Sequence, residues 1–480
     1  MRRYLIAVAA LLVLAAGGGL AAWYLHVKHA SRDVKGSSTV EFVTTQEALP
    51  PLPEPGIAWP TYGHDAEHLR FGNGITLAPP FKRIWLFRAQ SLVEFPPAIG
   101  YGRLFFSNNA GVLFAIGAKN GKRAWKLDSH RCVASSPALD RHVVYQAYLN
   151  APPCNRKPSA ALTGEVVAYA VGTGRVLWRR AIGPSETSPV VSRASIFVGD
   201  WDGRVWALRR KTGKTRWVTK LQGQVKGSVA ISGNRIFVGD YSGHLYALSY
   251  ASGKVLWKAS LQLRFGGTGH IYATPSAAYG RVYVGATDGK VYSFGAESGK
   301  LRWSQSTGGY VYSSTAVWRD RVYAGSYSRR FFCFDAATGR IVWQFTANGQ
   351  ISGSPTVIAG RVYFATLAGR TYALDARSGA PLWTFPDGKY SPVVADSKRL
   401  YLIGYARIYG LVPSATQGTI TAQELRRIRH PGVLATRYAS RKAASTHGGV
   451  QVCNVVLARR GASPTRFWGI VRKVQRACVR

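Results

Sequence analysis

Between residues 57 and 413, short runs of alternating apolar and polar residues are separated by turns that contain glycine. "RVYVGA" (281–286) is one such run, and "GKVYSF" (289–294) is the run that follows it. Alternation with a period of two, rich in β-branched and aromatic residues, is typical of strands, and the glycines mark tight turns. The pattern therefore predicts many short antiparallel strands and an all-β fold.

These strands fall into groups, most of which are similar in length. Most groups end on an eleven-residue unit that closes with tryptophan, as in "ALSYASGKVLW" (247–257) and "CFDAATGRIVW" (333–343). The spacing of the tryptophans is about forty residues, the period of a four-stranded propeller blade. Counting a degenerate last copy, the repeats predict an eight-bladed β-propeller over residues 57–413, because a closed ring leaves only short sheet edges. The recurring tryptophans are Trp85, Trp125, Trp178, Trp217, Trp257, Trp303, Trp343 and Trp383.

The unit resembles the tryptophan-docking motif of the pyrroloquinoline-quinone (PQQ) enzyme-repeat propellers. "WPTYGHDAEHLRFG" (59–72) is also similar to the lead-in segment of that superfamily. The resemblance implies that each tryptophan lies flat between neighbouring blades, beside a glycine at the seventh position of the motif. Since Trp85 precedes the first complete repeat, we expect its strand to complete the last blade, which ends at Pro413.

The chain ends predict export and membrane attachment. Arg2 and Arg3 precede an uncharged stretch, residues 4–25, which is long enough to span a bilayer. We therefore expect a cytoplasmic stub and transmembrane signal anchor (1–25) and a proline-rich linker (26–56). The propeller would then lie outside the cytoplasmic membrane on a single-pass anchor, and a cleaved signal peptide is the alternative. We expect residues 414–480 to form a small basic C-terminal extension tied by a disulfide, and a disordered basic arm that binds an anionic polymer is the alternative.

The five cysteines are compatible with an oxidising compartment. Cys132 and Cys154 lie in two loops on the same face of one predicted blade, so we expect them to form a disulfide. Cys453 and Cys478 share the C-terminal extension and are the second expected pair. Cys333 occupies a buried strand position of a docking unit, where we expect a free thiol.

The net charge of the chain is informative about its partners and not about its fold. The chain has 63 Lys and Arg against 22 Asp and Glu, a formal net charge of +41, which favours a polyanionic partner. Two series of repeat turns fall on one face of the propeller, because every second turn of an antiparallel sheet lies on the same side. This basic face carries an inner ring (Arg103, Arg235, Arg281, Arg321, Arg361 and Arg399) and an outer ring (Lys122, Arg175, Lys214, Lys254, Lys300 and Arg340). A solvated set of turns without a partner is the alternative interpretation.

The opposite face, called the loop face below, carries the longer loops. Loops gathered on one face of a repeat protein favour recognition. We expect an axial pocket there, lined by Glu94, Arg131, Glu186, Lys226, His270, Tyr310 and Lys389.

Catalytic motifs are not found in the sequence. It contains no Cys-Cys pair, no haem-attachment motif and few acidic residues for the PQQ and calcium that the superfamily's enzymes use. The pattern therefore favours a non-catalytic scaffold without a cofactor, similar to the BamB-type propeller subunit of outer-membrane protein assembly. Its expected partners are the membrane, envelope proteins or anionic envelope polymers rather than nucleic acid, and the propeller is expected to be monomeric. A PQQ-dependent dehydrogenase and an extracytoplasmic ligand-sensing propeller are the alternatives.

Overall fold

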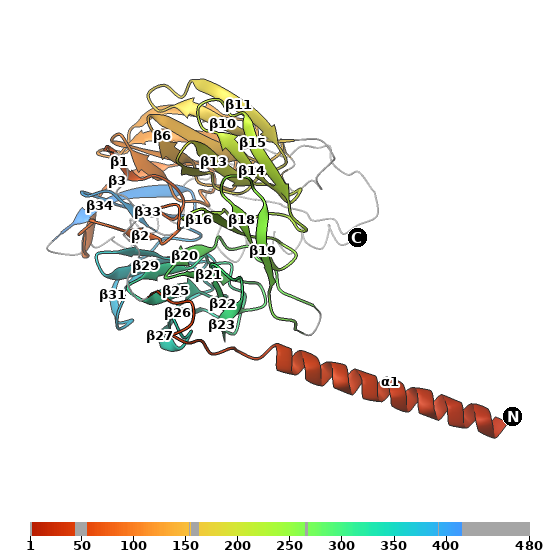
Figure 1. The fold of residues 1–480 in the computed structure, drawn as a ribbon. Coiled ribbons are helices and arrows are strands. Elements are labelled where there is room, and N and C mark those ends of the chain that lie inside the picture. The colour runs from red at the N-terminus through yellow and green to blue at the C-terminus, as the bar shows by residue number, and fades with distance from the viewer. Residues whose placement is uncertain are drawn as a thin grey trace, which may run out of the picture. The chain divides into compact units, whose positions relative to one another are not determined.

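The computed structural model describes residues 2–43, 55–152, 154, 163–264, 267–391 and 393–414 (Figure 1). The chain divides into two units, Met1–Gly418 and Thr419–Arg480. The second unit lies outside the described residues, and so does the predicted pair Cys453 and Cys478. Helix α1 (Arg2–Ala30) precedes the strands. Among the described residues, no helix combines the length and the apolar character that a membrane span needs.

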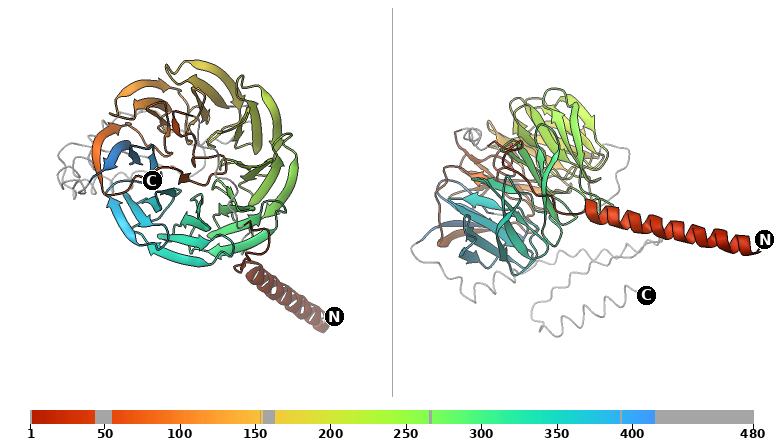
Figure 2. Two further views of the ribbon diagram at one scale, coloured as in Figure 1. Left: turned by 60° about the vertical axis from the view of Figure 1, so that its left-hand side comes forward. Right: turned by 60° about the horizontal axis from the view of Figure 1, so that its bottom comes forward.

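The described strands form eight sheets, arranged as blades around an axis (Figure 2). The bounds of the first four blades are as follows. Blade 1 contains β1 (Ile57–Trp59), β4 (Ala98–Gly100), β5 (Arg103–Ser107), β6 (Val112–Gly117) and β7 (Arg123–Asp128). Blade 2 contains β8 (Ala138–Asp140), β9 (Val143–Tyr148), β10 (Gly164–Ala170) and β11 (Val176–Ile182). Blade 3 contains β12 (Val190–Ser192), β13 (Ser195–Gly199), β14 (Arg204–Arg209) and β15 (Thr215–Lys220). Blade 4 contains β16 (Ala230–Ser232), β17 (Arg235–Gly239), β18 (His244–Ser249) and β19 (Val255–Ser260).

The remaining four blades continue around the ring. Blade 5 contains β20 (Ser276–Ala278), β21 (Arg281–Gly285), β22 (Lys290–Gly295) and β23 (Leu301–Ser306). Blade 6 contains β24 (Ala316–Trp318), β25 (Arg321–Gly325), β26 (Arg330–Asp335) and β27 (Ile341–Thr346). Blade 7 contains β2 (Phe71–Gly72), β28 (Thr356–Ile358), β29 (Arg361–Thr366), β30 (Arg370–Asp375) and β31 (Pro381–Phe385). Blade 8 contains β32 (Val394–Ala395), β33 (Leu400–Ile403), β34 (Arg407–Pro413) and β3 (Phe81–Arg88).

The ring closes in blade 8. Strand β3 pairs with β34 in antiparallel register, from Phe81 opposite Pro413 to Arg88 opposite Arg407. This confirms that the strand of Trp85 completes the last blade, and it confirms the count of eight. The two ends of the propeller are thereby joined by a ladder of backbone hydrogen bonds.

The tryptophans join each blade to the next. The Trp257 ring lies against Gly299 of the following blade, where the Cβ of any larger residue would come within 2.7 Å of Cδ2. Its indole Nε1 donates a hydrogen bond to the Ala296 carbonyl, 3.1 Å away. Seven of the eight indoles donate in this way to the next blade, at 2.9–3.3 Å. The expected wedge between blades is confirmed.

A second set of contacts joins the blades near the axis. The backbone N–H of Ser136 donates to Ser188 Oγ, and the N–H of Ser188 donates to Ser228 Oγ, each at 2.9 Å. The same bond continues from Ser228 to Thr274 Oγ1, from Thr274 to Ser314 Oγ and from Ser314 to Ser354 Oγ. A serine or threonine at the same place in successive repeats, in some repeats followed by proline, therefore supplies a belt of hydroxyl acceptors between blades.

Residues 57–72, the lead-in segment, run across the axis on the side of the basic face. Its carbonyl oxygens accept hydrogen bonds from the innermost strands of blades 2, 4, 5, 6 and 7, from Pro60 with Leu139 to Arg70 with Val357. Strand β1 pairs with β4 and strand β2 pairs with β28, so the segment begins in blade 1 and ends in blade 7. The lead-in segment therefore braces the blades from inside.

Candidate binding faces

The structure separates the two predicted rings of the basic face. All six arginines of the inner ring are partly or fully buried, and they contact protein groups. Arg103 donates to the carbonyls of Val171 and Gly172 at 2.8 and 3.1 Å, and Arg321 pairs with Asp320 at 2.7 Å. Arg235 pairs with Glu297, and Arg361 donates to the Ala359 carbonyl at 2.6 Å. The inner ring is therefore part of the framework.

The outer ring is placed differently. Lys122, Arg175, Lys214, Lys254, Lys300 and Arg340 are all exposed. Each stands beside the positive-φ glycine of a docking unit, so the turn that seats a tryptophan also presents a cation. A ring of exposed cations at blade-to-blade intervals is suited to contact an extended anionic surface or polymer.

The N-terminal arm, residues 31–43, packs on blade 5. Val34 forms a two-bond bridge with Ser304 on the outer strand β23, at 3.0 and 3.2 Å. At the other end of the arm the carbonyl oxygens of Ser37, Val40 and Glu41 accept from the guanidinium of Arg281, which is fully buried. Nothing in the sequence pattern of the predicted linker indicated this contact.

Two carboxylates fix the arm. Asp33 pairs with Lys290 at 3.0 Å and accepts from the Ser306 hydroxyl at 2.7 Å. Glu41 accepts from the Ser298 hydroxyl at 2.7 Å and from Arg302 Nε at 2.8 Å. Burial alone would raise the pKa of Glu41, but the bonds from Ser298 and Arg302 outweigh it and lower that pKa.

On the loop face, a cation lies among aromatic rings. The Lys226 ammonium lies 4.8, 5.0 and 5.7 Å from the ring centroids of Trp201, Tyr241 and Tyr272. It pairs with the Glu186 carboxylate at 3.0 Å. Glu186 also accepts from Trp201 Nε1 at 2.8 Å and from the Tyr272 hydroxyl at 3.3 Å. The structure thus brings together two of the predicted axial residues, Glu186 and Lys226.

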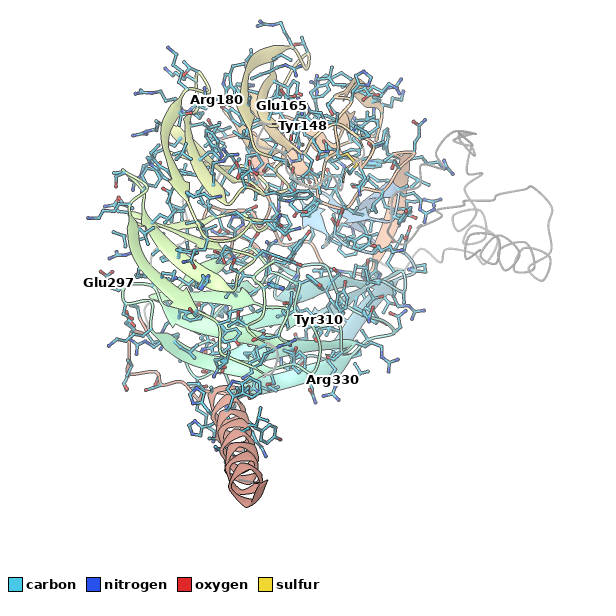
Figure 3. The ribbon with its side chains drawn as sticks, turned by 90° about the vertical axis from the view of Figure 1, so that its right-hand side faces the viewer. Tyr148, Glu165, Arg180, Glu297, Tyr310 and Arg330 are labelled. Carbon is cyan, nitrogen blue, oxygen red and sulfur yellow. A yellow bond between two sulfur atoms is a disulfide. The ribbon has the colours of Figure 1, made fainter. Side chains whose placement is uncertain are left out.

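The other predicted axial residues join this aromatic cluster or lie apart from it. His270 is exposed and stacks on Tyr241, with ring centroids 4.4 Å apart. Tyr310, labelled in Figure 3, lies with Tyr312 and Tyr327 and is 49% exposed. Lys389 lies 4.9 Å from the centroid of the Tyr405 ring. The sequence analysis missed the aromatic residues, although Trp201, Tyr241, Tyr327 and Tyr405 follow equivalent strands of their repeats.

Arg131 lies in the loop between β7 and β8 and pairs with Glu165 of blade 2 at 2.9 Å. Glu165 is the cross-strand neighbour of Tyr148, as Figure 3 shows. The predicted disulfide between Cys132 and Cys154 is present in the same region. Cys333 is the free buried thiol that was expected, and burial raises its pKa to about 12. Arg131 therefore holds its own loop against strand β10 of blade 2 and does not line an axial pocket with Glu186 and Lys226.

The residues present do not fit a PQQ and calcium centre. Both Glu186 oxygens accept bonds from Lys226, Trp201 and Tyr272. Burial, together with the neighbouring Glu186, raises the pKa of Glu94, whose carboxylate accepts from Asn109 at 3.3 Å. Across the described part of the chain, no three His, Cys, Asp or Glu side chains are grouped to hold a metal ion. We derive no chemistry through these groups.

Three cavities lie on the basic face. One of about 450 Å³ lies between the lead-in segment and blades 3 and 4, beside His64 and Arg193. Another of about 710 Å³ lies between the lead-in segment and blade 8, beside Lys119 and Arg399. A third, of about 320 Å³, is bounded by Glu41, Arg235 and Arg281.

The sequence profile of the family described as "Outer membrane protein assembly factor BamB" matches residues 157–219, 202–316 and 307–415. These matches together span more than half of the chain. The chain belongs to this family of PQQ-like β-propellers. Its repeats and closed ring are therefore shared with relatives of differing function.

Two curated relatives show this range. Quinohemoprotein alcohol dehydrogenase from Comamonas testosteroni is 31% identical over 182 residues, 36% of this chain and 20% of that protein. Outer membrane protein assembly factor BamB from Xanthomonas campestris pv. campestris is 26% identical over 133 residues, 25% of this chain and 29% of that protein. The chain thus spans less than a third of the length of either relative.

Solved structures support the fold. The crystal structure of the Comamonas dehydrogenase has a TM-score of 0.63 at 14% identity and covers 77% of this chain and 82% of its own. BamB from Moraxella catarrhalis has a TM-score of 0.59 at 15% identity and covers 69% of this chain and 100% of its own. At such identities the likeness concerns the fold alone.

Proposed function

We propose that this protein is a non-catalytic envelope scaffold whose basic face docks a polyanion through the outer ring. The observation that carries the proposal is the division of the basic face. The inner-ring arginines contact protein groups, whereas all six outer-ring cations are exposed. The overall charge of +41 adds long-range attraction for the same class of partner.

The experiment compares two variants with the same change in net charge. The first replaces Lys122, Lys214, Lys254 and Lys300 of the outer ring with glutamine. The second replaces the exposed residues Arg88, Lys126, Lys220 and Lys258, which lie on outer strands away from those turns. Binding of long-chain polyphosphate is measured by fluorescence anisotropy of a labelled polymer between 50 and 500 mM NaCl.

We expect the outer-ring variant to bind more weakly at low salt and with a shallower dependence on salt, because fewer counterions are released on binding. The strand variant should stay close to the unmodified protein. Equal losses in both variants, or binding that is independent of salt, would contradict the proposal.

We also infer that the propeller works outside the cytoplasm, held by residues 4–25 as a single-pass anchor. The disulfide between Cys132 and Cys154 supports an oxidising compartment. A reporter enzyme that is active only after export, fused after residue 414, tests the side on which the propeller lies. An inactive reporter would contradict this inference.

A dehydrogenase is the second candidate, favoured by the identity to the Comamonas enzyme. Titration with PQQ and calcium, followed by quinone absorbance and dye-linked alcohol oxidation, decides between the two. Stoichiometric binding with turnover would overturn the non-catalytic proposal.

A further inference from the structure

A buried cation lies in the lead-in segment near the axis. The Arg70 side chain is 1% exposed, and its guanidinium carbon lies 4.0 Å from the centroid of the Tyr62 ring. The Tyr62 hydroxyl in turn hydrogen-bonds Ser354 Oγ of the hydroxyl belt, at 2.8 Å. The backbone of Arg70 is fixed on both sides, since its N–H donates to the Gly63 carbonyl and its carbonyl accepts from Val357. The guanidinium is therefore held in one place.

Two neighbouring donors of this guanidinium lack an acceptor. Neither Nε nor Nη2 of Arg70 has a hydrogen-bond partner among the described residues, although both atoms are buried. In Arg235, Arg361 and Arg399 only Nε is left in this way. Nε and Nη2 form the side of the guanidinium that binds a carboxylate or oxyanion with two parallel bonds. In Arg70, both nitrogens of that edge are without a hydrogen-bond partner among the described residues.

Its own neighbours offset the charge only in part. Tyr62 and Asp65 both attract the guanidinium, but no ion pair joins Asp65 to Arg70 in the part of the chain that the structure describes. Asp65 Oδ1 accepts from the Leu69 N–H at 2.9 Å, and Asp65 Oδ2 is buried without a hydrogen-bond partner among the same residues. Burial, with the nearby Arg70, lowers the pKa of His68 to about 3, so His68 is neutral and donates to the Val229 carbonyl at 2.8 Å. A buried charge without a paired counter-charge is costly, by several kcal/mol as an order of magnitude.

The same segment carries backbone strain. His64, His68 and Arg70 all have positive φ, at 78°, 57° and 57°. Each such residue costs about 1–2 kcal/mol, and these conformations persist where the surroundings require them. Strain and an unpaired cation in one short segment indicate that a further group completes it.

We propose that the Arg70 edge binds a small oxyanion or carboxylate inside the propeller. The guanidinium stacks on Tyr62 and offers two parallel N–H groups in its own plane. The ligand is small, because the surroundings of Arg70 are buried, and it braces the lead-in segment between blades 4 and 7. This site does not depend on the proposed polyanion docking, since Arg70 lies apart from the exposed outer ring.

Thermal unfolding of the full-length protein tests the site. The protein is compared in sulfate, phosphate, formate, acetate and chloride at constant ionic strength, beside the variants Arg70→Gln and Arg340→Gln. Arg340 is the matched control, because it is an exposed arginine on the outer ring. We expect a saturable rise in Tm with one class of anion, kept in R340Q and weakened at least tenfold in apparent affinity in R70Q.

The anion arms identify the ligand class: sulfate and phosphate act as oxyanions, and formate and acetate as carboxylates. A rise that is the same in R70Q would reflect screening of the basic surface and would overturn the proposal. So would loss of stability in Asp65→Asn with no response to any anion, because Asp65 would then be the counter-charge. If R70Q does not fold, crystals of the unmodified protein grown with selenate and with formate decide, and absence of bound anion beside Arg70 in both overturns the proposal.

Discussion

The contact between tryptophan and glycine can be tested by adding one methyl group. Gly299 has φ of +68°, and a Cβ at this position would come within 2.7 Å of Cδ2 and 2.8 Å of Cε3 of Trp257. Gly233 lies in a turn of the neighbouring blade with φ of +58°, and a Cβ there meets nothing within 4 Å. Gly299→Ala and Gly233→Ala therefore share a similar backbone cost and differ in the collision with the indole.

The expected magnitudes follow from these two parts. An alanine in the left-handed region costs about 1–2 kcal/mol, and this is the whole expected loss for Gly233→Ala. Overpacking against a fixed ring adds about 1–3 kcal/mol, so Gly299→Ala should lose about 2–5 kcal/mol of the free energy of unfolding. The Trp257 ring has little room to yield, because its Nε1 is bonded to the Ala296 carbonyl at 3.1 Å.

Urea unfolding, followed by tryptophan fluorescence and far-ultraviolet circular dichroism, measures both variants. Coincident transitions and a common slope are needed for the free energies to be compared. Fluorescence should also change in the folded state of Gly299→Ala, because the indole is displaced. Equal losses in the two variants would show that the glycine is needed only for its backbone conformation, and the wedge interpretation would be refuted.

Three further predictions concern the disulfide, one histidine and the arm. The double substitution C132S/C154S should lower the free energy of unfolding by about 3 kcal/mol, because the disulfide closes a loop with a sequence separation of 22. In urea unfolding, a reductant should destabilise the unmodified protein and leave the double variant unchanged. His68 has a pKa of about 3 when folded against 6.5 as its ordinary value, so the unfolded state binds the extra proton between these values. Stability should therefore fall as pH falls from about 6.5 towards 3, by up to about 1.4 kcal/mol per unit, and His68→Gln should flatten this part of the profile; parallel profiles would contradict the assignment. Glu41→Ala should release the arm and increase tryptic cleavage after Lys35. The control is Glu297→Ala, which should not increase this cleavage, because the Glu297 side chain is 72% exposed and does not contact the arm. Mass spectrometry of the fragments measures the cleavage, and equal cleavage in the two variants would refute the role of Glu41.

Much of the fold could be predicted because it is repeated. A tryptophan recurs in every blade, and the turn glycine of the docking unit recurs in seven of the eight, so an ambiguous copy can be interpreted from the others. Ring closure by the strand of Trp85 followed from counting strands in the last repeat. The pair Cys132 and Cys154 followed from placing two loops on one face. The axial site was predicted less well, because Arg131 pairs with Glu165 in blade 2 and the aromatic residues around Lys226 were overlooked.

The sequence alone determined the blades, their number, the tryptophan wedges and the two rings of cations on one face. All of these follow from the periodic pattern of neighbouring residues, which can be recognised without knowing which distant residues are in contact. Only the tertiary structure decided which cations are free. Arg281 meets carbonyl groups of the arm more than 200 residues away in the chain, whereas Lys300 in the same blade meets solvent. No local pattern distinguishes the two residues, because burial of a charge depends on what the rest of the chain lays over it.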